Sequence, residues 1–339
     1  MKGLLKWTAI SVIVVVVLFA TGISATIGWR PILGPKYRSL TDRKFELTPQ
    51  RLERGRYLVT SVAACLGCHS EHDWKAHGAP VVAGLEGGGE VMPIPDLPGT
   101  VVARNITSDR ETGVGAWTDD ELARAIREGV DREGQTLFPM MPYEHYRQMS
   151  DEDLASIIVY LRTLPPVRRA LPKSEIIFPV KYLVRSAPEP VMQPVYTDAA
   201  ASTDPARRGA YLVNIAGCAD CHTPDVRGVP VAGMDFAGGA PRNGPWGNVS
   251  SANLTPDDSG IKYYDEALFL QVMHTGFVRA RELKPIMPYW IYGKMSDDDL
   301  KAIFAYLRTL KPVHHRVDNS EAASLCKLCR QKHGAGQEN

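Results

Sequence analysis

The chain has 339 residues, and its 39 basic and 38 acidic side chains leave a formal net charge of +1. This length allows two ordinary domains with additional segments. The near balance of charge gives no indication of a nucleic-acid partner, and we expect none. The 29 glycines and 25 prolines favour compact domains with long loops.

The first segment is an uncharged, mostly apolar run over residues 7–29, preceded by two lysines. About 20 apolar residues suffice to cross a bilayer. Trp7 and Trp29 stand at the two ends of the run, where membrane interfaces favour aromatic residues. We therefore expect a transmembrane anchor over residues 7–29. The alternative is a cleaved signal peptide, for which Ala20-Thr21-Gly22 offers a small-residue cleavage site.

Two Cys-x-x-Cys-His pentads follow, one in each half of the chain. The residues that carry them are Cys65, Cys68, His69, Cys218, Cys221 and His222. This spacing is typical of c-type haem attachment. The two thiols can add to the two vinyl groups of one haem, and the adjacent imidazole then supplies the proximal iron ligand. The alternative is a pair of disulfide or zinc Cys-x-x-Cys units with incidental histidines. The pattern predicts two covalently bound haem c groups.

Covalent haem attachment also bears on location. In bacteria, c-type haem is joined to its protein on the outer side of the cytoplasmic membrane. We therefore expect a single-pass protein of the bacterial cytoplasmic (inner) membrane, with its haem domains on the periplasmic side.

The sequence around the pentads is repeated. Arg-Gly-x-Tyr-Leu-Val occurs at residues 54–59 and 208–213, Met-Pro-Tyr at 141–143 and 287–289, and Tyr-Leu-Arg-Thr-Leu at 160–164 and 306–310. Such self-similarity indicates a duplicated structural unit. We expect one domain over residues 47–167 and a second over 204–317, joined by a linker at 168–203 and followed by a tail at 318–339 with a third Cys-x-x-Cys.

Each repeat predicts the same order of helices. Thr48 or Asp204 can cap a helix that runs into the pentad. Thr118, followed by three acidic residues, can begin a second helix, and Ser150 or Ser296 can begin a third. Apolar residues recur at helical spacing within these segments, and long loops rich in glycine and proline separate them. The sequence therefore predicts an all-α architecture.

Two methionines are the expected sixth ligands of the irons. Met141 and Met287 each open a Met-Pro-Tyr motif at matching places in the two repeats, and an axial thioether raises the reduction potential of haem. The alternative is that they are core methionines. Met140 is a rival in the first repeat, but Ile286 stands at the matching place in the second, so Met141 is preferred.

Residues around the haems are predicted less directly. The proximal imidazoles need a backbone carbonyl as hydrogen-bond acceptor, and Pro80 and Pro230 either provide it or only shape turns. Tyrosines that border the haems or bond a propionate are Tyr143, Tyr146, Tyr289 and Tyr292; weaker propionate candidates are Arg104 and Asn253. The histidines expected to be surface or loop residues are His72, His77, His145, His274, His314 and His315.

The motifs together resemble one family. Gly-x-Tyr-Leu, Asn-Ile-Thr-x-Asp, Gly-Val-Gly-Ala-Trp-Thr-Asp-Asp-Glu and Met-Pro-Tyr-x-x-Tyr are similar to those of the cytochrome c subunits of membrane-bound alcohol, aldehyde and gluconate dehydrogenases of bacteria. The resemblance covers residues 47–317 and implies two tandem class I cytochrome c-like domains. It implies thioether bonds at Cys65, Cys68, Cys218 and Cys221, and axial pairs His69 with Met141 and His222 with Met287. Those subunits commonly carry three haem units, whereas this chain has two.

The third Cys-x-x-Cys, formed by Cys326 and Cys329, follows the second domain. Arg330 stands where a haem pentad needs histidine, so we do not expect a third haem. A periplasmic disulfide between the two cysteines is the plainer interpretation. The alternative is a metal site, to which His333 would add a third ligand.

The sequence therefore predicts a membrane-anchored dihaem cytochrome c that relays single electrons, without catalytic residues of its own. The expected donor is a dehydrogenase or a quinol-oxidising partner, and the expected acceptor is a cytochrome or a terminal oxidase. The alternative is a dihaem enzyme, peroxidase-like or thiosulfate-oxidising, with one open or unusually ligated iron; Met-Pro-Tyr in both repeats argues against it. A structural or assembly subunit with redox-silent haems is a third possibility.

Overall fold

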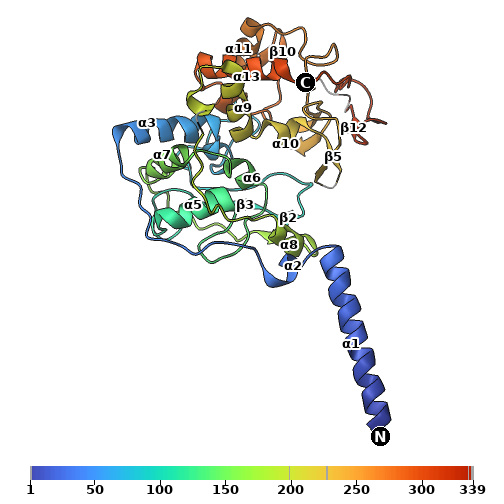
Figure 1. The fold of residues 1–339 in the computed structure, drawn as a ribbon. Helices are drawn as coiled ribbons and strands as arrows, with labels where there is room; N and C mark the ends of the chain where they lie inside the picture. Colours follow the sequence, from blue (N-terminus) through green and yellow to red (C-terminus); the bar gives the residue numbers. More distant parts are fainter. Residues whose placement is uncertain (1, 198, 227, 335, 337–339) are drawn as a thin grey trace.

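A computed structural model describes residues 2–197, 199–226, 228–334 and 336. Helix α1 (Lys2–Ala25) projects from a body made of the rest of the chain (Figure 1). By length and composition it could cross a membrane, with a mean hydropathy of 2.4 and hardly any buried surface. It begins and ends earlier than the predicted 7–29, and at its C-terminal end Gly28 takes a positive φ of 70° after the last turn. Trp29 then leads into the short helix α2 (Arg30–Leu33).

The first domain is built from five helical segments, and the second repeats them. In the first they are α3 (Pro49–Tyr57), continued by a π-helical turn η1 (Leu58–Val62), then α4 (Cys65–Cys68), α5 (Asp119–Glu128), α6 (Tyr143–Tyr146) and α7 (Asp151–Leu161). In the second they are α9 (Pro205–Ile215), α10 (Cys218–His222), α11 (Glu266–Thr275), α12 (Tyr289–Tyr292) and α13 (Asp297–Thr309). The tail is described to residue 336, apart from residue 335.

The predicted helix starts are confirmed. The side chains of Thr48, Ser150 and Ser296 each accept a hydrogen bond from the backbone N–H three residues on, and Asp204 caps α9 in the same manner. Thr118 forms a full capping box with its third following residue at the start of α5. The caps fix where each helix begins, and the helices then bury a shared core of aliphatic side chains.

A glycine lets the first and last helices of each domain cross at backbone contact. A Cβ atom added to Gly55 in α3 would lie 1.9 Å from the carbonyl oxygen of Ser156 in α7, and one added to Gly209 in α9 would lie 1.9 Å from that of Ala302 in α13. Only glycine permits this approach. The crossing explains why Arg-Gly-x-Tyr is repeated.

The all-α prediction is correct for the framework but not for the loops, which form six antiparallel two-stranded pairs in the part of the chain that the structure describes. They are β1 (Glu90–Val91) with β3 (Val102–Ala103), β2 (Gly99–Thr100) with β4 (Glu175–Ile176), β5 (Asp225–Val226) with β6 (Val229–Pro230), β7 (Pro241–Gly244) with β8 (Gly247–Ser250), β9 (Phe277–Val278) with β10 (Arg281–Glu282), and β11 (Ser324–Leu325) with β12 (Lys332–His333). Long loops packed on a domain must pair their backbone polar groups, which favours such pairs.

The linker contacts the first domain and α2. Strand β4 pairs with β2, and α8 (Val180–Leu183) lies beside α2, where Arg185 donates to the carbonyl of Pro31 at 3.1 Å. Two short 3₁₀ turns, η2 (Val184–Ser186) and η3 (Ala199–Ala201), complete it.

Repeat-related residues join the two domains reciprocally. The hydroxyl of Tyr57 donates to Asp299 at 2.5 Å, and that of Tyr211 donates to Asp153 at 2.7 Å. Each aspartate also forms an ion pair within its own domain. Asp153 pairs with Arg54 at 2.8 Å, and Asp299 pairs with Arg208 at 2.6 Å. The two domains therefore pack about an approximate two-fold relation.

Candidate functional site

Each pentad directly follows a residue in the left-handed region. Ala64, with φ 49°, precedes α4, and Gly217, with φ 65°, precedes α10. The turn lets a short helix present two thiols and a histidine together. Within the described residues the six cysteines form no disulfide. Burial raises the pKa of the Cys65 and Cys218 thiols to about 12.

The histidines of the two pentads are oriented by backbone carbonyls. Nδ1 of His69 lies 2.6 Å from the carbonyl oxygen of Arg104, and Nδ1 of His222 lies 2.7 Å from that of Ala252. A carbonyl oxygen only accepts, so the proton is on Nδ1, and Nε2 keeps the lone pair that a metal ion requires. Burial lowers the pKa of both imidazoles, that of His222 to about 4, so both are neutral.

Of the two alternatives for Pro80 and Pro230, the one in which they supply these carbonyls is therefore wrong, and the one in which they only shape turns is supported. The carbonyl of Pro80 accepts from the backbone N–H of Asp73 at 3.0 Å, and Pro230 pairs with Asp225 in the β5–β6 hairpin. Both prolines shape the turns that follow the pentads.

The two Met-Pro-Tyr motifs adopt the same backbone turn. The carbonyl of Met141 accepts from the N–H two residues on at 2.8 Å, and that of Met287 does so at 2.7 Å. Pro142 and Pro288 have nearly equal dihedral angles, with φ −81° and −79° and ψ 48° and 54°. Both methionines are partly buried and pack against the same core as Cys65 and Cys218. The turn thus presents equivalent thioethers in the two domains.

Tyrosines hold this turn against the pentads. The hydroxyl of Tyr146 donates to the carbonyl of Ala63 at 2.8 Å, and that of Tyr292 donates to the carbonyl of Ala216 at 2.6 Å. These two tyrosines contact residues just before the pentads, and their hydroxyl protons are not available to a propionate; their place beside the haems stays a prediction. The buried hydroxyl of Tyr143 has no hydrogen-bond partner within the described residues.

Asn253 is not a propionate ligand, contrary to the prediction. It is buried, its Oδ1 accepts from the N–H of Thr255 at 2.9 Å, and its Nδ2 donates to the carbonyl of Val313 at 2.9 Å. Asn105 makes the equivalent contacts in the first domain. Arg104 pairs with Asp131 at 3.0 Å and is half-exposed, so its propionate role stays a prediction.

Two of the histidines expected at the surface are buried. His72 packs against Trp74 and Trp290 with ring centroids 5.2 and 4.7 Å away, and His315 is 1% exposed beside the C-terminal cysteines. Trp74 is only two residues from His72, but Trp290 and the C-terminal cysteines reach these histidines through the fold, which no local pattern indicated. The remaining four histidines are partly or largely exposed, and each of them meets a carboxylate.

The two pentads lie at the contact between the domains. Gly67 of the first pentad faces Ile291 of α12, since a Cβ there would lie 2.4 Å from its Cδ1. Asp220 of the second pentad accepts from His145 at 2.7 Å and raises the pKa of that histidine. The domain contact therefore brings the two candidate sites next to each other.

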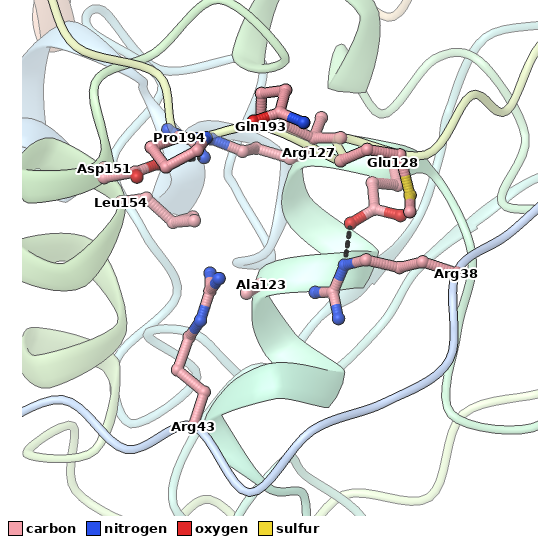
Figure 2. Close-up of a pocket in the computed structure, with 11 residues that line it drawn as sticks. Arg38, Arg43, Ala123, Arg127, Glu128, Asp151, Leu154, Gln193 and Pro194 are labelled. Atoms are coloured by element: carbon pink, nitrogen blue, oxygen red, sulfur yellow. Dashed lines mark hydrogen bonds and ion pairs between the residues drawn. The ribbon is translucent and has the colours of Figure 1, made fainter.

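A separate cavity of about 250 Å³ lies away from the pentads, between α5, α7 and the linker (Figure 2). Its charged side chains pair with one another: Arg38 with Glu128 at 2.7 Å, and Arg127 with Asp151 at 2.5 Å. The first pair holds the segment after α2 against α5, and the second joins α5 to α7 within the first domain. We therefore assign the cavity a structural role.

The residues present fit a c-type haem in each domain. His69 is partly exposed, its Nδ1 is held by the carbonyl of Arg104, and burial lowers its pKa, so its Nε2 is a neutral donor. Each domain supplies two thiols, an imidazole with a free Nε2 and a thioether, which is the donor set of such a haem.

Comparison with known proteins gives the same result. The model of the family described as cytochrome c matches residues 52–165 and again residues 206–311. The chain is 29% identical to the cytochrome c subunit of the quinone alcohol dehydrogenase of Gluconobacter oxydans, over 77% of this chain and 55% of that protein. It is 30% identical to the gluconate 2-dehydrogenase cytochrome c subunit of Pantoea cypripedii, over 76% and 59%. A diheme cytochrome c-type protein of Cereibacter sphaeroides is 29% identical, over 74% and 82%.

The chain thus spans little more than half the length of the two dehydrogenase subunits, but most of the diheme protein. The two family matches fall on the two structural repeats, each of which carries one pentad and one Met-Pro-Tyr turn. The chain belongs to the cytochrome c family, with two cytochrome c domains and two covalently bound haem c groups.

Proposed function

We propose that the chain is a membrane-anchored dihaem cytochrome c that passes single electrons between a dehydrogenase and a terminal acceptor. The supporting observation is that both domains repeat the same donor set on the same backbone framework. The proposed thioether and axial residues are Cys65, Cys68, His69, Met141, Cys218, Cys221, His222 and Met287. The proposed domains are residues 47–167 and 204–317.

Each haem, when bound, supplies an iron that changes oxidation state by one electron. The protein's own residues prepare that site. The carbonyls of Arg104 and Ala252 fix the imidazole tautomers, and Tyr146 and Tyr292 hold the methionine turns against the pentads. Because hydrogen bonds hold the histidine and the methionine turn of each domain in place, we expect these side chains to move little when the iron gains or loses an electron. That property suits a relay better than catalysis at an open iron.

The contact between the domains supports transfer from one site to the other. Gly67 of one pentad faces α12 of the other domain, and Asp220 of the other pentad bonds His145. A donor of the dehydrogenase class is proposed because relatives are named as cytochrome subunits of alcohol and gluconate dehydrogenases. A cytochrome or a terminal oxidase is the proposed acceptor.

Membrane anchoring is supported by apolar surface beside α1. Leu33 of α2 is 72% exposed and Phe178, just before α8, is 78% exposed, and Ile32 and Ile177 are also largely exposed. Figure 1 shows α2 and α8 at the end of α1 where that helix joins the body. Apolar side chains at this level would enter the membrane interface if α1 spans the bilayer. We therefore propose that α1 is retained and that the domains are periplasmic.

The mass of the purified protein tests whether α1 is retained. We expect the polypeptide with two haems to keep residues before Ala20 and to remain in the membrane fraction after a high-salt wash, because α1 has the length and hydropathy of a span. A mature chain that starts shortly after Ala20 and washes off membranes would show that the segment is a signal peptide.

Magnetic circular dichroism of the oxidised, full-length protein tests the proposed function. We expect two low-spin haems with histidine and methionine ligands, because each domain offers one Nε2 and one thioether. A high-spin haem, or one without methionine, would refute the relay and favour a dihaem enzyme with an open iron.

A further inference from the structure

The C-terminal tail folds back on the second domain and forms a cluster outside both pentads. The β11–β12 hairpin carries Cys326 and Cys329 in its turn and His333 on its second strand, and His315 follows α13. One ligand atom from each of these four residues lies within 4.8 Å of all the others. Cys326 Sγ is 3.4 Å from His315 Nε2, and Cys329 Sγ is 2.9 Å from His333 Nε2.

This set of donors matches a tetrahedral metal ion. Zinc binds cysteine sulfur at about 2.3 Å and histidine nitrogen at about 2.0–2.1 Å, so its ligand atoms stand about 3.3–3.8 Å apart. The four atoms could reach this spacing with shifts of about 1 Å. Two thiolates with two imidazoles favour zinc over calcium or magnesium, which take oxygen ligands.

The cluster is enclosed, and one imidazole is already oriented. Cys329, His315 and His333 are buried, and Met234 and Ala237 pack against Cys329. Nδ1 of His315 bonds the carbonyl of Ala237 at 2.8 Å, which leaves Nε2 to face the cysteines. Metal-ligating histidines usually make such a bond through their other nitrogen.

The backbone around the cluster also brings the four side chains together. A Cβ atom on Gly239 would lie 2.6 Å from ring atoms of both His315 and His333, so only glycine allows the two imidazoles to approach. The hairpin turn is closed by the N–H of Cys326 to the carbonyl of Gln331 at 2.9 Å, and Arg330 takes a left-handed φ of 61°. The turn therefore holds both sulfurs toward the histidines.

The first domain closes the equivalent loop without a metal. Arg169 is the counterpart of His315 in the first repeat, because the two residues are as far apart in the sequence as Met141 and Met287. Arg169 donates to the carbonyl of Gly89 at 2.9 Å. The N–H of Gly89 bonds the carbonyl of His69, just as the N–H of Gly238 bonds that of His222. The cysteine–histidine cluster of domain two therefore stands where domain one uses an arginine.

We propose that His315, Cys326, Cys329 and His333 form a structural zinc site that secures the C-terminal tail to the loop behind the second haem. A simple disulfide between the two cysteines would leave two buried imidazoles aimed at it without a ligand. A third haem is excluded by the arginine at position 330, where a haem pentad has histidine.

Zinc uptake by the full-length dihaem protein tests this site. The protein is treated with a phosphine reductant and a chelator, freed of both, and titrated with Zn²⁺ against a chromogenic chelator. We expect one tightly held equivalent per chain. We also expect that Cys326→Ser, Cys329→Ser and His333→Ala each lose it while both haems remain.

His314→Ala is the matched control, because its largely exposed side chain neighbours His315 and pairs with Asp257 at 3.0 Å, outside the cluster. It should keep the full equivalent of zinc. No uptake by the reduced wild-type protein, or equal uptake by the cysteine variants, would overturn the proposal. The wild-type titration does not depend on how any variant folds, and haem content is measured separately.

Discussion

Replacing Met141 with histidine lowers the midpoint potential of one haem by on the order of 0.2 V and leaves the other unchanged, and Met287→His does the reverse. Axial ligands set haem potentials over about 0.8 V, and methionine holds the higher part of that range. Because each methionine packs in its own domain, the two effects should be separate. Spectroelectrochemical titration with magnetic circular dichroism measures both haems in one sample.

Met140 provides the control for this prediction. It adjoins Met141, but its counterpart in the second domain is Ile286. We expect Met140→Leu to leave both potentials and both methionine signatures in place, whereas Met141→Leu removes one signature. Loss of a signature in Met140→Leu alone would transfer the assignment to Met140.

Gly55→Ala is expected to destabilise the first domain by an amount at the upper end of the about 1–3 kcal/mol typical of overpacked cores. The new methyl group would meet the carbonyl oxygen of Ser156 at 1.9 Å, so α3 and α7 would have to move apart. Backbone cannot yield as a flexible side chain does. Gly209→Ala should act equally on α9 and α13, through the carbonyl of Ala302.

Thermal unfolding followed by circular dichroism, with hydrogen exchange to locate the effect, measures this change in the full chain. We expect faster exchange in α3 and α7 for Gly55→Ala, and in α9 and α13 for Gly209→Ala. Gly22→Ala is the control, because nothing lies within 4 Å of the added atom. Unchanged stability in both core variants would show that the crossings are looser than described.

Local patterns in the sequence predicted the framework well. The caps at Thr48, Thr118 and Ser150 depend on residues three positions apart, and these formed as expected. The duplicated Met-Pro-Tyr motif indicated equivalent turns for the same reason. Such signals depend on short-range chemistry that the surrounding fold does not alter.

Long-range contacts explain what the sequence did not show. The carbonyls that orient His69 and His222 come from residues 35 and 30 positions later, so the sequence could not decide whether the nearer Pro80 and Pro230 supply them or only shape turns. His315 looked like a loop residue because its burial depends on the tail folding back over it. Two-stranded pairs in the loops also escaped prediction, because each strand is only two to four residues long.

The reciprocal contacts of Tyr57 with Asp299 and Tyr211 with Asp153 make the chain equivalent to a fused homodimer with an isologous interface. In such an arrangement the two halves are interchangeable unless something distinguishes them. Any preferred direction of electron flow must therefore come from residues that break the symmetry. One such difference lies at the contact between the domains. His145 of the first domain bonds Asp220, whereas its counterpart in the second domain, Ile291, packs on Gly67. One of the two equivalent contacts is therefore polar and the other is apolar.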